Sequence, residues 1–320
     1  MDVESWPLSW QEQQWAWLLE LRAGARLPHA LLLAGPSGTG KTGFAVHFAG
    51  LLLCSAQGTQ PCGTCRQCRL VAAGSHPNLV RVQPAEPGKA IRIEQIRALR
   101  EFCAARPHQP GWRVILIEPA EALNSNAANA LLKTLEEPGA ETLLLLVAHE
   151  PGRLPATVRS RCRLLRFAAP DSRVGLAWVR ARLPGTVDPE TIDAVQVLRA
   201  AGGRPLQALV LAEPQTAAQL ARLEQLAAAV AAGTVAPAAA ATESAGLNWT
   251  LALEALLALL AGRIRGAALA RRQPSAALFD CLDAVVEARR TLAASPNLNA
   301  ELVWDRLWLA WRRMGAVVDG

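Results

Sequence analysis

Lysine is scarce in this sequence, because only three of its 33 basic residues are lysine, at positions 41, 89 and 133. The chain also lacks a long apolar run: its most apolar segment, 251–261, contains Glu254 and is too short to cross a bilayer. The first ten residues show no basic region followed by an apolar core, so we expect no signal peptide. The lack of a long apolar run and of signal-peptide features argues against a membrane-spanning or secreted protein.

A disulfide framework is also not indicated, since the seven cysteines are an odd number and four of them cluster within residues 54–68. Such a cluster favours a metal site in a reducing cytoplasm. With 320 residues and 51% hydrophobic content, the chain should fold into two or three globular domains. The net charge of +6 is equally compatible with nucleic-acid binding and with solvated surface arginines.

The most informative segment is a complete phosphate-binding loop at 35–42, with the sequence G-P-S-G-T-G-K-T. It follows the apolar run 30–34 and precedes a helix-like segment at 43–53, the strand, loop and helix order that such loops require. Glycines let the backbone approach phosphate oxygens, and free N–H groups at a helix N-terminus bind anions. The predicted nucleotide-binding positions of the loop are Gly35, Gly38, Gly40, Lys41 and Thr42.

Lys41 is the position where this arginine-rich chain retains a lysine. A phosphate loop needs a compact point charge there, which a guanidinium group does not replace well. We expect Lys41 to reach the β- and γ-phosphates of ATP and Thr42 to hold Mg²⁺.

Apolar runs and helical patterns alternate along the first half of the chain. Strands are predicted at 30–34, 78–83, 114–117, 142–148 and 163–167, with helices at 6–22, 91–105 and 122–136. This alternation predicts an α/β domain with a doubly wound, mostly parallel sheet. After residue 168 the pattern is helical, which predicts a small helical unit at 169–212 and a second helical domain at 213–320. Segment 233–246 is either a helix break or a loop.

The second half of an ATP site is incomplete. The strand 114–117 is followed by Glu118 and Pro119, where an ATPase normally has an aspartate that holds the metal and a glutamate that activates water. Glu118 takes the place of the metal carboxylate, but proline carries no base. We therefore expect weak or absent hydrolysis.

The cysteine cluster has the spacing C-x₇-C-x₂-C-x₂-C, formed by Cys54, Cys62, Cys65 and Cys68. Four thiolates with no open position suit a structural Zn²⁺ site. An iron–sulfur cluster fits the same ligands, but nothing else in the sequence indicates electron transfer. The isolated cysteines 103, 162 and 281 are expected to be packing residues.

The sequence alone leaves two possible roles open for several arginines. Arg161, in Ser160-Arg161-Cys162, is either a surface charge or an arginine finger for a neighbouring subunit, and Arg204 at a helix start is either solvated or a phosphate contact. Arginines on the predicted helix 91–105 and just after it, with Lys133, either track DNA phosphates or form a solvated face. The arginines in question are Arg92, Arg97, Arg100 and Arg106.

Taken together, these segments resemble a known family. The run R-L-P-H-A-L-L-L at 26–33, the phosphate loop, the four-cysteine insertion, N-A-A-N-A-L-L-K-T-L-E-E-P at 126–138 and R-S-R-C at 159–162 occur in this order. The set resembles the delta-prime subunits of the bacterial DNA polymerase III clamp loader. These belong to the AAA+ family, which includes the gamma/tau subunits. The similarity is strong over about residues 5–210 and architectural beyond.

The resemblance implies an AAA+ P-loop domain (1–168) with a zinc module at 54–68, a helical lid (169–212) and a helical collar (213–320). It implies a cytoplasmic bacterial protein in a hetero-pentamer with gamma/tau and delta subunits, acting on primer-template DNA and, indirectly, on the sliding clamp. Arg161 would be the trans arginine finger and Arg204 the lid arginine.

The resemblance further implies a non-hydrolysing part of the DNA-directed DNA polymerase holoenzyme (EC 2.7.7.7). Its loop either binds ATP and Mg²⁺ or is retained from an ancestor that did. The family's polar residue at the end of strand 142–148 is missing, because Ala148 and His149 stand there. The alternative is an ATP-hydrolysing gamma/tau-type motor subunit, against which Pro119 and the lack of a long C-terminal extension argue. A third possibility is a zinc-bearing P-loop enzyme of another class, such as a nucleotide kinase. The helical C-terminal third argues against it, because a kinase does not need such a domain.

Overall fold

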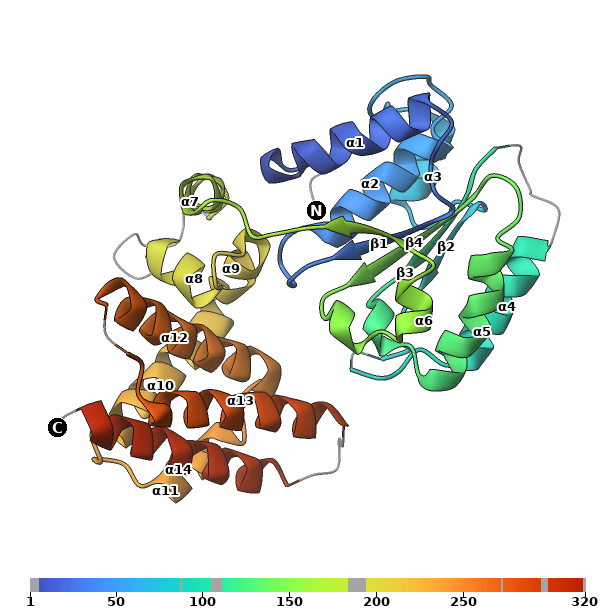
Figure 1. The fold of residues 1–320 in the computed structure, drawn as a ribbon. Coiled ribbons are helices and arrows are strands. Elements are labelled where there is room, and N and C mark those ends of the chain that lie inside the picture. Colours follow the sequence, from blue (N-terminus) through green and yellow to red (C-terminus); the bar gives the residue numbers. More distant parts are fainter. Residues whose placement is uncertain are drawn as a thin grey trace. The chain divides into compact units, whose positions relative to one another are not determined.

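The computed structural model describes residues 6–86, 88–104, 111–183, 194–271, 273–294 and 299–318. The chain divides into two compact units, residues 1–170 and residues 171–320. Figure 1 shows an α/β first unit and a second unit in which the labelled elements are all helices. The predicted fold class, a parallel α/β domain followed by helical regions, is confirmed. The predicted three-part division at 168 and 212 stays a prediction.

The first unit contains a five-stranded sheet with the order β2-β3-β4-β1-β5, and every paired strand is parallel. The five strands coincide with the predicted apolar runs to within one residue at each end. Their bounds are β1 Ala30–Ala34, β2 Leu79–Val82, β3 Arg113–Ile117, β4 Thr142–Ala148 and β5 Arg163–Arg166.

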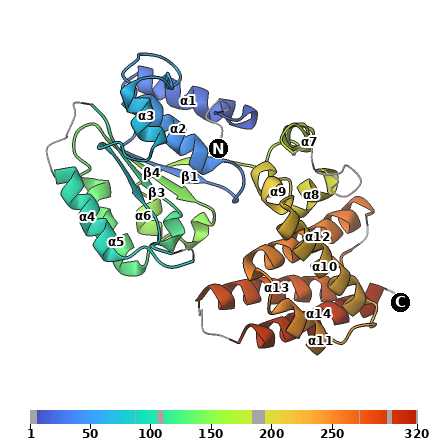
Figure 2. The same ribbon diagram turned by 180° about the vertical axis from the view of Figure 1, so that it is seen from behind.

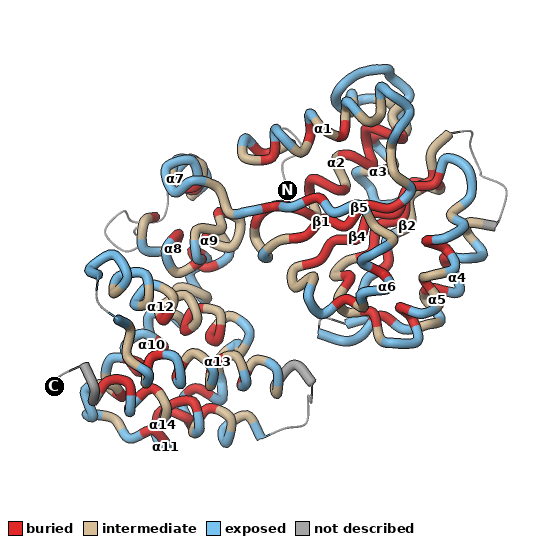
Figure 3. Tube along the Cα trace, viewed as in Figure 1, coloured by how far each residue is buried: buried red, intermediate tan, exposed pale blue. Residues whose placement is uncertain are grey.

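The three central strands are buried along their whole length, which explains their continuous apolar sequences. Figure 3 shows this buried centre of the sheet. Alternate residues serve opposite faces: Leu32, Ile115 and Leu144 belong to one hydrophobic cluster, and Leu31, Leu116 and Leu145 to another.

Each face is covered by its own helices, as Figure 2 shows from behind. The first cluster includes residues of α4 (Ile93–Ala104), α5 (Ser125–Glu136) and the short α6 (Ala156–Arg159). The second includes residues of α1 (Glu12–Ala23) and α2 (Lys41–Leu53), and α3 (Arg66–Ala72) packs beside α2. The result is the three-layer arrangement of a doubly wound domain.

The predicted N-terminal helix begins later than residue 6. Leu8 is extended, with φ −65° and ψ 150°, a short 3₁₀ turn (η2) covers Ser9–Gln11, and α1 starts at Glu12. Periodicity alone missed this because the first residues pack against the phosphate loop instead of continuing the helix. The segment 233–246, left open from the sequence, contains the helix α11 (Pro237–Ser244).

The second unit has two hydrophobic cores, both built from helices. One lies among α7 (Ser172–Arg180), α8 (Ala194–Ala200) and α9 (Pro205–Leu211). The other lies among α10 (Pro214–Ala231), α11, α12 (Trp249–Leu269), α13 (Ala276–Ala294) and α14 (Ala300–Val318). Leu220 packs against both cores. Among the described residues, no helix combines the length and apolarity that crossing a bilayer requires.

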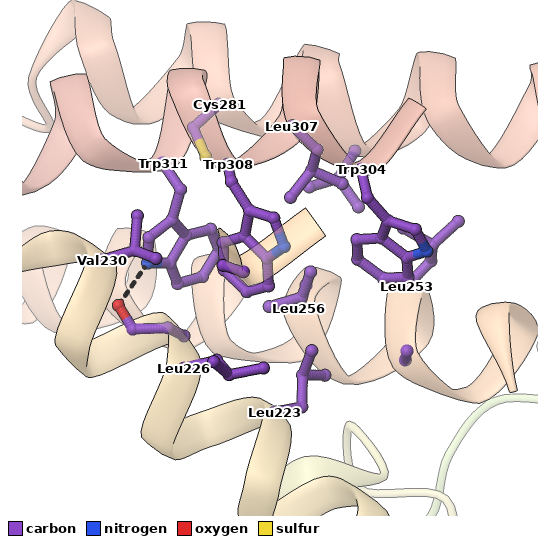
Figure 4. Packing of buried hydrophobic residues seen from close by; sticks show 14 of the residues in the cluster. Leu223, Leu226, Val230, Leu253, Leu256, Cys281, Trp304, Leu307, Trp308 and Trp311 are labelled. Atoms are coloured by element: carbon purple, nitrogen blue, oxygen red, sulfur yellow. Dashed lines mark hydrogen bonds between the residues drawn. The ribbon is translucent and has the colours of Figure 1, made fainter. Parts of the chain in front are cut away.

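Three tryptophans of α14 organise the larger core. Trp304, Trp308 and Trp311 are spaced to lie on one face of the helix and are at most 1% exposed. Trp308 Nε1 donates to Ser244 Oγ at 3.1 Å, and Trp311 Nε1 donates to the Ala227 carbonyl at 3.0 Å. Figure 4 shows the latter bond beside Leu226 and Val230 of α10. Satisfied indole N–H groups let these large rings be fully buried.

Candidate functional site

The phosphate loop joins β1 to α2 at the carboxyl edge of the sheet. Its three predicted glycines adopt positive φ angles of 156°, 78° and 88° at Gly35, Gly38 and Gly40. A Cβ atom on Gly35 would lie 1.9 Å from the carbonyl oxygen of Phe167, so no other residue fits there. Gly40 is the N-cap of α2, and the free N–H groups of the first helical turn therefore begin at the loop.

Lys41 is buried at the start of α2, and its ammonium group lies inside the loop. Nζ donates to the carbonyl oxygens of Gly35 at 2.6 Å and Pro36 at 2.7 Å. The loop thus curls around a fixed positive charge, which is the electrostatic requirement for binding a polyphosphate.

Thr42 and Glu118 are brought together from distant parts of the sequence. Glu118 follows β3, and its Oε1 accepts a hydrogen bond from Thr42 Oγ1. Its second oxygen, Oε2, lies 3.8 Å from Nη2 of Arg81 on β2. A hydroxyl and a carboxylate side by side form an oxygen set that suits Mg²⁺. Arg81 was not foreseen from the sequence, because nothing in the linear pattern places β2 next to β3.

The positions where hydrolytic residues would stand do not supply a free base. Pro119 follows Glu118 directly, and Glu121 Oε1 instead accepts hydrogen bonds from the backbone N–H groups of His149 at 2.9 Å and Glu150 at 3.0 Å. Glu121 therefore caps the end of β4. Burial, with a smaller effect of nearby Lys41, lowers the pKa of His149 to about 4, so its imidazole is neutral at neutral pH.

Arg161 lies at the amino-terminal end of the parallel strands, whereas the phosphate loop lies at their carboxyl-terminal end. In the β1–β5 register Arg163 pairs with Leu31, whereas the loop begins after Ala34. Arg161 comes before the start of β5, so the strands separate it from its own loop by roughly 13 Å or more at about 3.3 Å per residue.

The ion-pair partner of Arg161 lies at the same end of the strands. Its Nη2 and Nε lie 2.6 and 2.8 Å from Oε1 of Glu136, the last residue of α5, which precedes the amino end of β4. Nη1 donates to the Thr157 carbonyl at 3.0 Å. Arg161 is 36% exposed, and Glu136 is 51% exposed, so this is a solvent-accessible ion pair.

Arg204 belongs to the second unit and is the N-cap residue of α9. Its Nε donates to the Ala201 carbonyl at 2.6 Å, and Nη2 lies 3.4 Å from Oε2 of Glu254 on α12. Both side chains are mostly buried, so Glu254 fixes the direction of this guanidinium group within its own unit.

The four clustered cysteines meet in space. Their sulfur atoms all lie within 4.8 Å of one another, with Cys54 and Cys65 at 3.9 Å and Cys62 and Cys68 at 3.9 Å. Tetrahedral ligands at a Zn–S distance of about 2.3 Å are about 3.8 Å apart. The donor set therefore has the dimensions of a four-thiolate metal site.

Local backbone geometry supports thiolates at this cluster. The N–H groups of Cys62, Cys65 and Cys68 each lie 3.4 Å from the sulfur of an earlier cysteine. A hydrogen bond from Ser55, together with backbone N–H groups, lowers the pKa of Cys65 to about 5. Burial raises the pKa of Cys68 to about 12, so this thiol ionises readily only with a bound cation beside it.

The arginines of α4 lie in a surface of mixed charge. Arg97, Arg100 and Lys133 line a hollow between α4 and α5 that Glu101, Glu136 and Glu137 also line. These carboxylates weaken the case for a dedicated phosphate track. Arg106, the last arginine of the predicted set, lies outside the described residues.

Comparison with known proteins identifies the family. A family model described as "DNA polymerase III, delta subunit" matches residues 10–171, about half of the chain. The chain belongs to the DNA polymerase III delta-prime family. The delta-prime subunit of Pseudomonas aeruginosa is 43% identical over 201 residues, which are 62% of this chain and 59% of that protein. This family member thus spans about three fifths of the length of that relative.

Similarity to the tau branch is weaker. The tau subunit of Bacillus subtilis is 32% identical over 169 residues, 52% of this chain and 29% of that protein. A solved structure of a gamma subunit-related protein from Thermotoga maritima covers 93% of this chain and 99% of its own, at 16% identity and a TM-score of 0.48.

Proposed function

We propose that this delta-prime family member is a subunit of a DNA polymerase III clamp loader, where it helps to load the sliding clamp onto primed DNA. Family membership supports this proposal. The observation that carries it is the position of Arg161, which is exposed at the edge of the sheet opposite its own phosphate loop. If Arg161 contacts a nucleotide, that nucleotide belongs to a neighbouring chain.

Within this role the chain does not hydrolyse ATP by itself. Pro119 offers no base, Glu121 is engaged by backbone N–H groups, and Ala148 with neutral His149 replaces a small polar residue at the end of β4. The residues of the loop still fit a nucleotide: Lys41 and the first turn of α2 would hold its phosphates, and Thr42 with Glu118 would hold Mg²⁺. A bound Mg²⁺ would neutralise phosphate charge.

The remaining parts have roles in the same complex. The cysteine cluster holds one structural Zn²⁺, α7–α9 form the lid with Arg204, and α10–α14 form the collar through which gamma/tau and delta subunits assemble. The complex acts on primer-template DNA and is located in the bacterial cytoplasm. The sliding clamp is reached through the other subunits.

One observation favours a second candidate, an ATP-hydrolysing gamma/tau-type motor. The loop is complete, with Lys41 and Thr42 in place and Glu118 beside them. ATP turnover by the isolated chain separates the two candidates.

Assembly tests the proposal. Mixed with gamma/tau and delta subunits of its own organism, the chain should form one hetero-pentamer, seen as a single peak in size-exclusion chromatography with mass detection. That complex should load clamps onto primed DNA faster than the same mixture without the chain. A chain that elutes alone at its mass of 34.1 kDa, with loading unchanged, would contradict the proposal.

A further inference from the structure

The residues before α1 are attached to the phosphate loop. Gln11 Nε2 and Trp10 Nε1 donate to the carbonyl oxygen of Thr39, at 3.0 and 3.1 Å. Gln11 is buried, and its Oε1 accepts a hydrogen bond from the Leu8 backbone at 3.1 Å. These contacts hold the segment against the loop and fix where its first described residue, Trp6, lies.

The indole ring of Trp6 rests on the first turn of α2. A Cβ atom on Gly43 would lie 2.0 Å from Trp6 Cζ2 and 2.2 Å from Cη2, and one on Gly40 would lie 3.1 Å from Cη2. The ring therefore contacts the backbone at two glycines one helical turn apart. Glycine inside a helix costs about 1 kcal/mol relative to alanine. The contact with Trp6 explains why glycine stands at position 43, because any side chain there would overlap the indole ring.

The loop sets the direction in which a polyphosphate would lie. Lys41 would serve the β- and γ-phosphates, and Thr42 with Glu118 would suit a Mg²⁺ bound there. The γ end of a bound polyphosphate would therefore face the end of β3, and its α-phosphate would lie further along the first turn of α2.

The free N–H groups of that turn end at Gly43, because the next residue, Phe44, donates its N–H to the Gly40 carbonyl at 3.0 Å. A nucleoside attached to the α-phosphate would leave the loop beside Gly43. This is the surface that the indole of Trp6 covers.

We propose that Trp6 closes the nucleoside side of the phosphate loop, so that the site takes an inorganic polyphosphate more readily than a nucleoside triphosphate. The inference rests on the proposed ability of the loop to bind phosphate and adds a residue that selects against the nucleoside. If the indole leaves the nucleoside side open in about one molecule in ten, ATP binds about tenfold more weakly than it would to a site that is always open. Removing the indole should therefore raise the affinity for ATP by about tenfold.

Calorimetric titration of the full chain with Mg²⁺–ATP and with Mg²⁺–tripolyphosphate tests this. Trp6→Ala should bind ATP about tenfold more tightly than the natural sequence, with tripolyphosphate affinity unchanged. Gly43→Ala should raise the ratio of ATP affinity to tripolyphosphate affinity in the same direction. Gly43→Ala keeps the tryptophan but places a Cβ where its ring lies, so it checks the effect without deleting Trp6. Trp17→Ala is the matched control, because Trp17 packs near Arg163, away from the loop.

The outcomes are separable. ATP affinity that falls in Trp6→Ala would show that the ring is a platform for the base and would overturn the inference. Unchanged ATP affinity with normal tripolyphosphate binding would overturn it and leave the phosphate site standing. If no variant binds tripolyphosphate or ATP, both the inference and the proposed nucleotide site fail.

Discussion

Replacing Arg161, the proposed trans arginine finger, with alanine is expected to lower ATP hydrolysis at the site of the proposed neighbouring subunit by about 10³- to 10⁵-fold, the range known for arginine fingers. The guanidinium group would leave Glu136 and contact phosphate oxygens, which accept the same pair of N–H donors with more negative charge. Single-turnover hydrolysis in the reconstituted complex is the measurement, because it resolves the affected site from the others.

Two variants control for structural damage. Arg159→Ala removes an exposed arginine from the same turn and should leave hydrolysis unchanged. Arg161→Lys keeps the charge without the planar fork and should recover only a small part of the rate. Folding and assembly should be the same in all of these variants. Hydrolysis that is unaffected at every site of the Arg161→Ala complex would remove the role assigned to this residue.

Loss of the proposed structural Zn²⁺ is expected to have the next largest effect. Elemental analysis should find about one Zn²⁺ per chain, and Cys62→Ser or Cys65→Ser should abolish it, since each removes one of four ligands. Loss of a structural metal is among the few changes that cost about 4 kcal/mol or more, which lowers the melting temperature of the first unit by roughly 10 °C.

Cys103 provides the control for the metal experiment, because it lies on α4, away from the cluster. Cys103→Ser should keep the full zinc content and nearly the full melting temperature. Fully folded natural protein without metal, unaffected by chelators, would refute the four-thiolate assignment.

The sheet was predictable because its central strands are buried on both faces and therefore appear as unbroken apolar runs, such as 142–148. The order of the strands was not, since hydrophobic pattern says which segments are strands but not which are neighbours. The start of the first helix was misjudged for a related reason. Trp6 and Leu8 fit a helical pattern but pack against glycines of the loop.

The candidate site divides in the same way. The loop and the cysteine cluster are contiguous motifs whose local spacing fixes their geometry, so the sequence predicts them directly. Contacts made across the fold could not be read from it: Arg81 with Glu118, Glu121 with the end of β4, and Trp6 with Gly43. One signal was present for the last of these, namely a glycine inside the first turn of an otherwise strong helix.

This chain carries a phosphate loop, and we propose that it does not itself split ATP and that its catalytic contribution is made in trans. Steady-state ATP turnover by the purified, isolated chain tests this most directly, with the natural sequence and Lys41→Ala measured side by side. Both proteins should turn over ATP only at the background rate. Robust turnover by the natural sequence that disappears in Lys41→Ala would contradict this proposal.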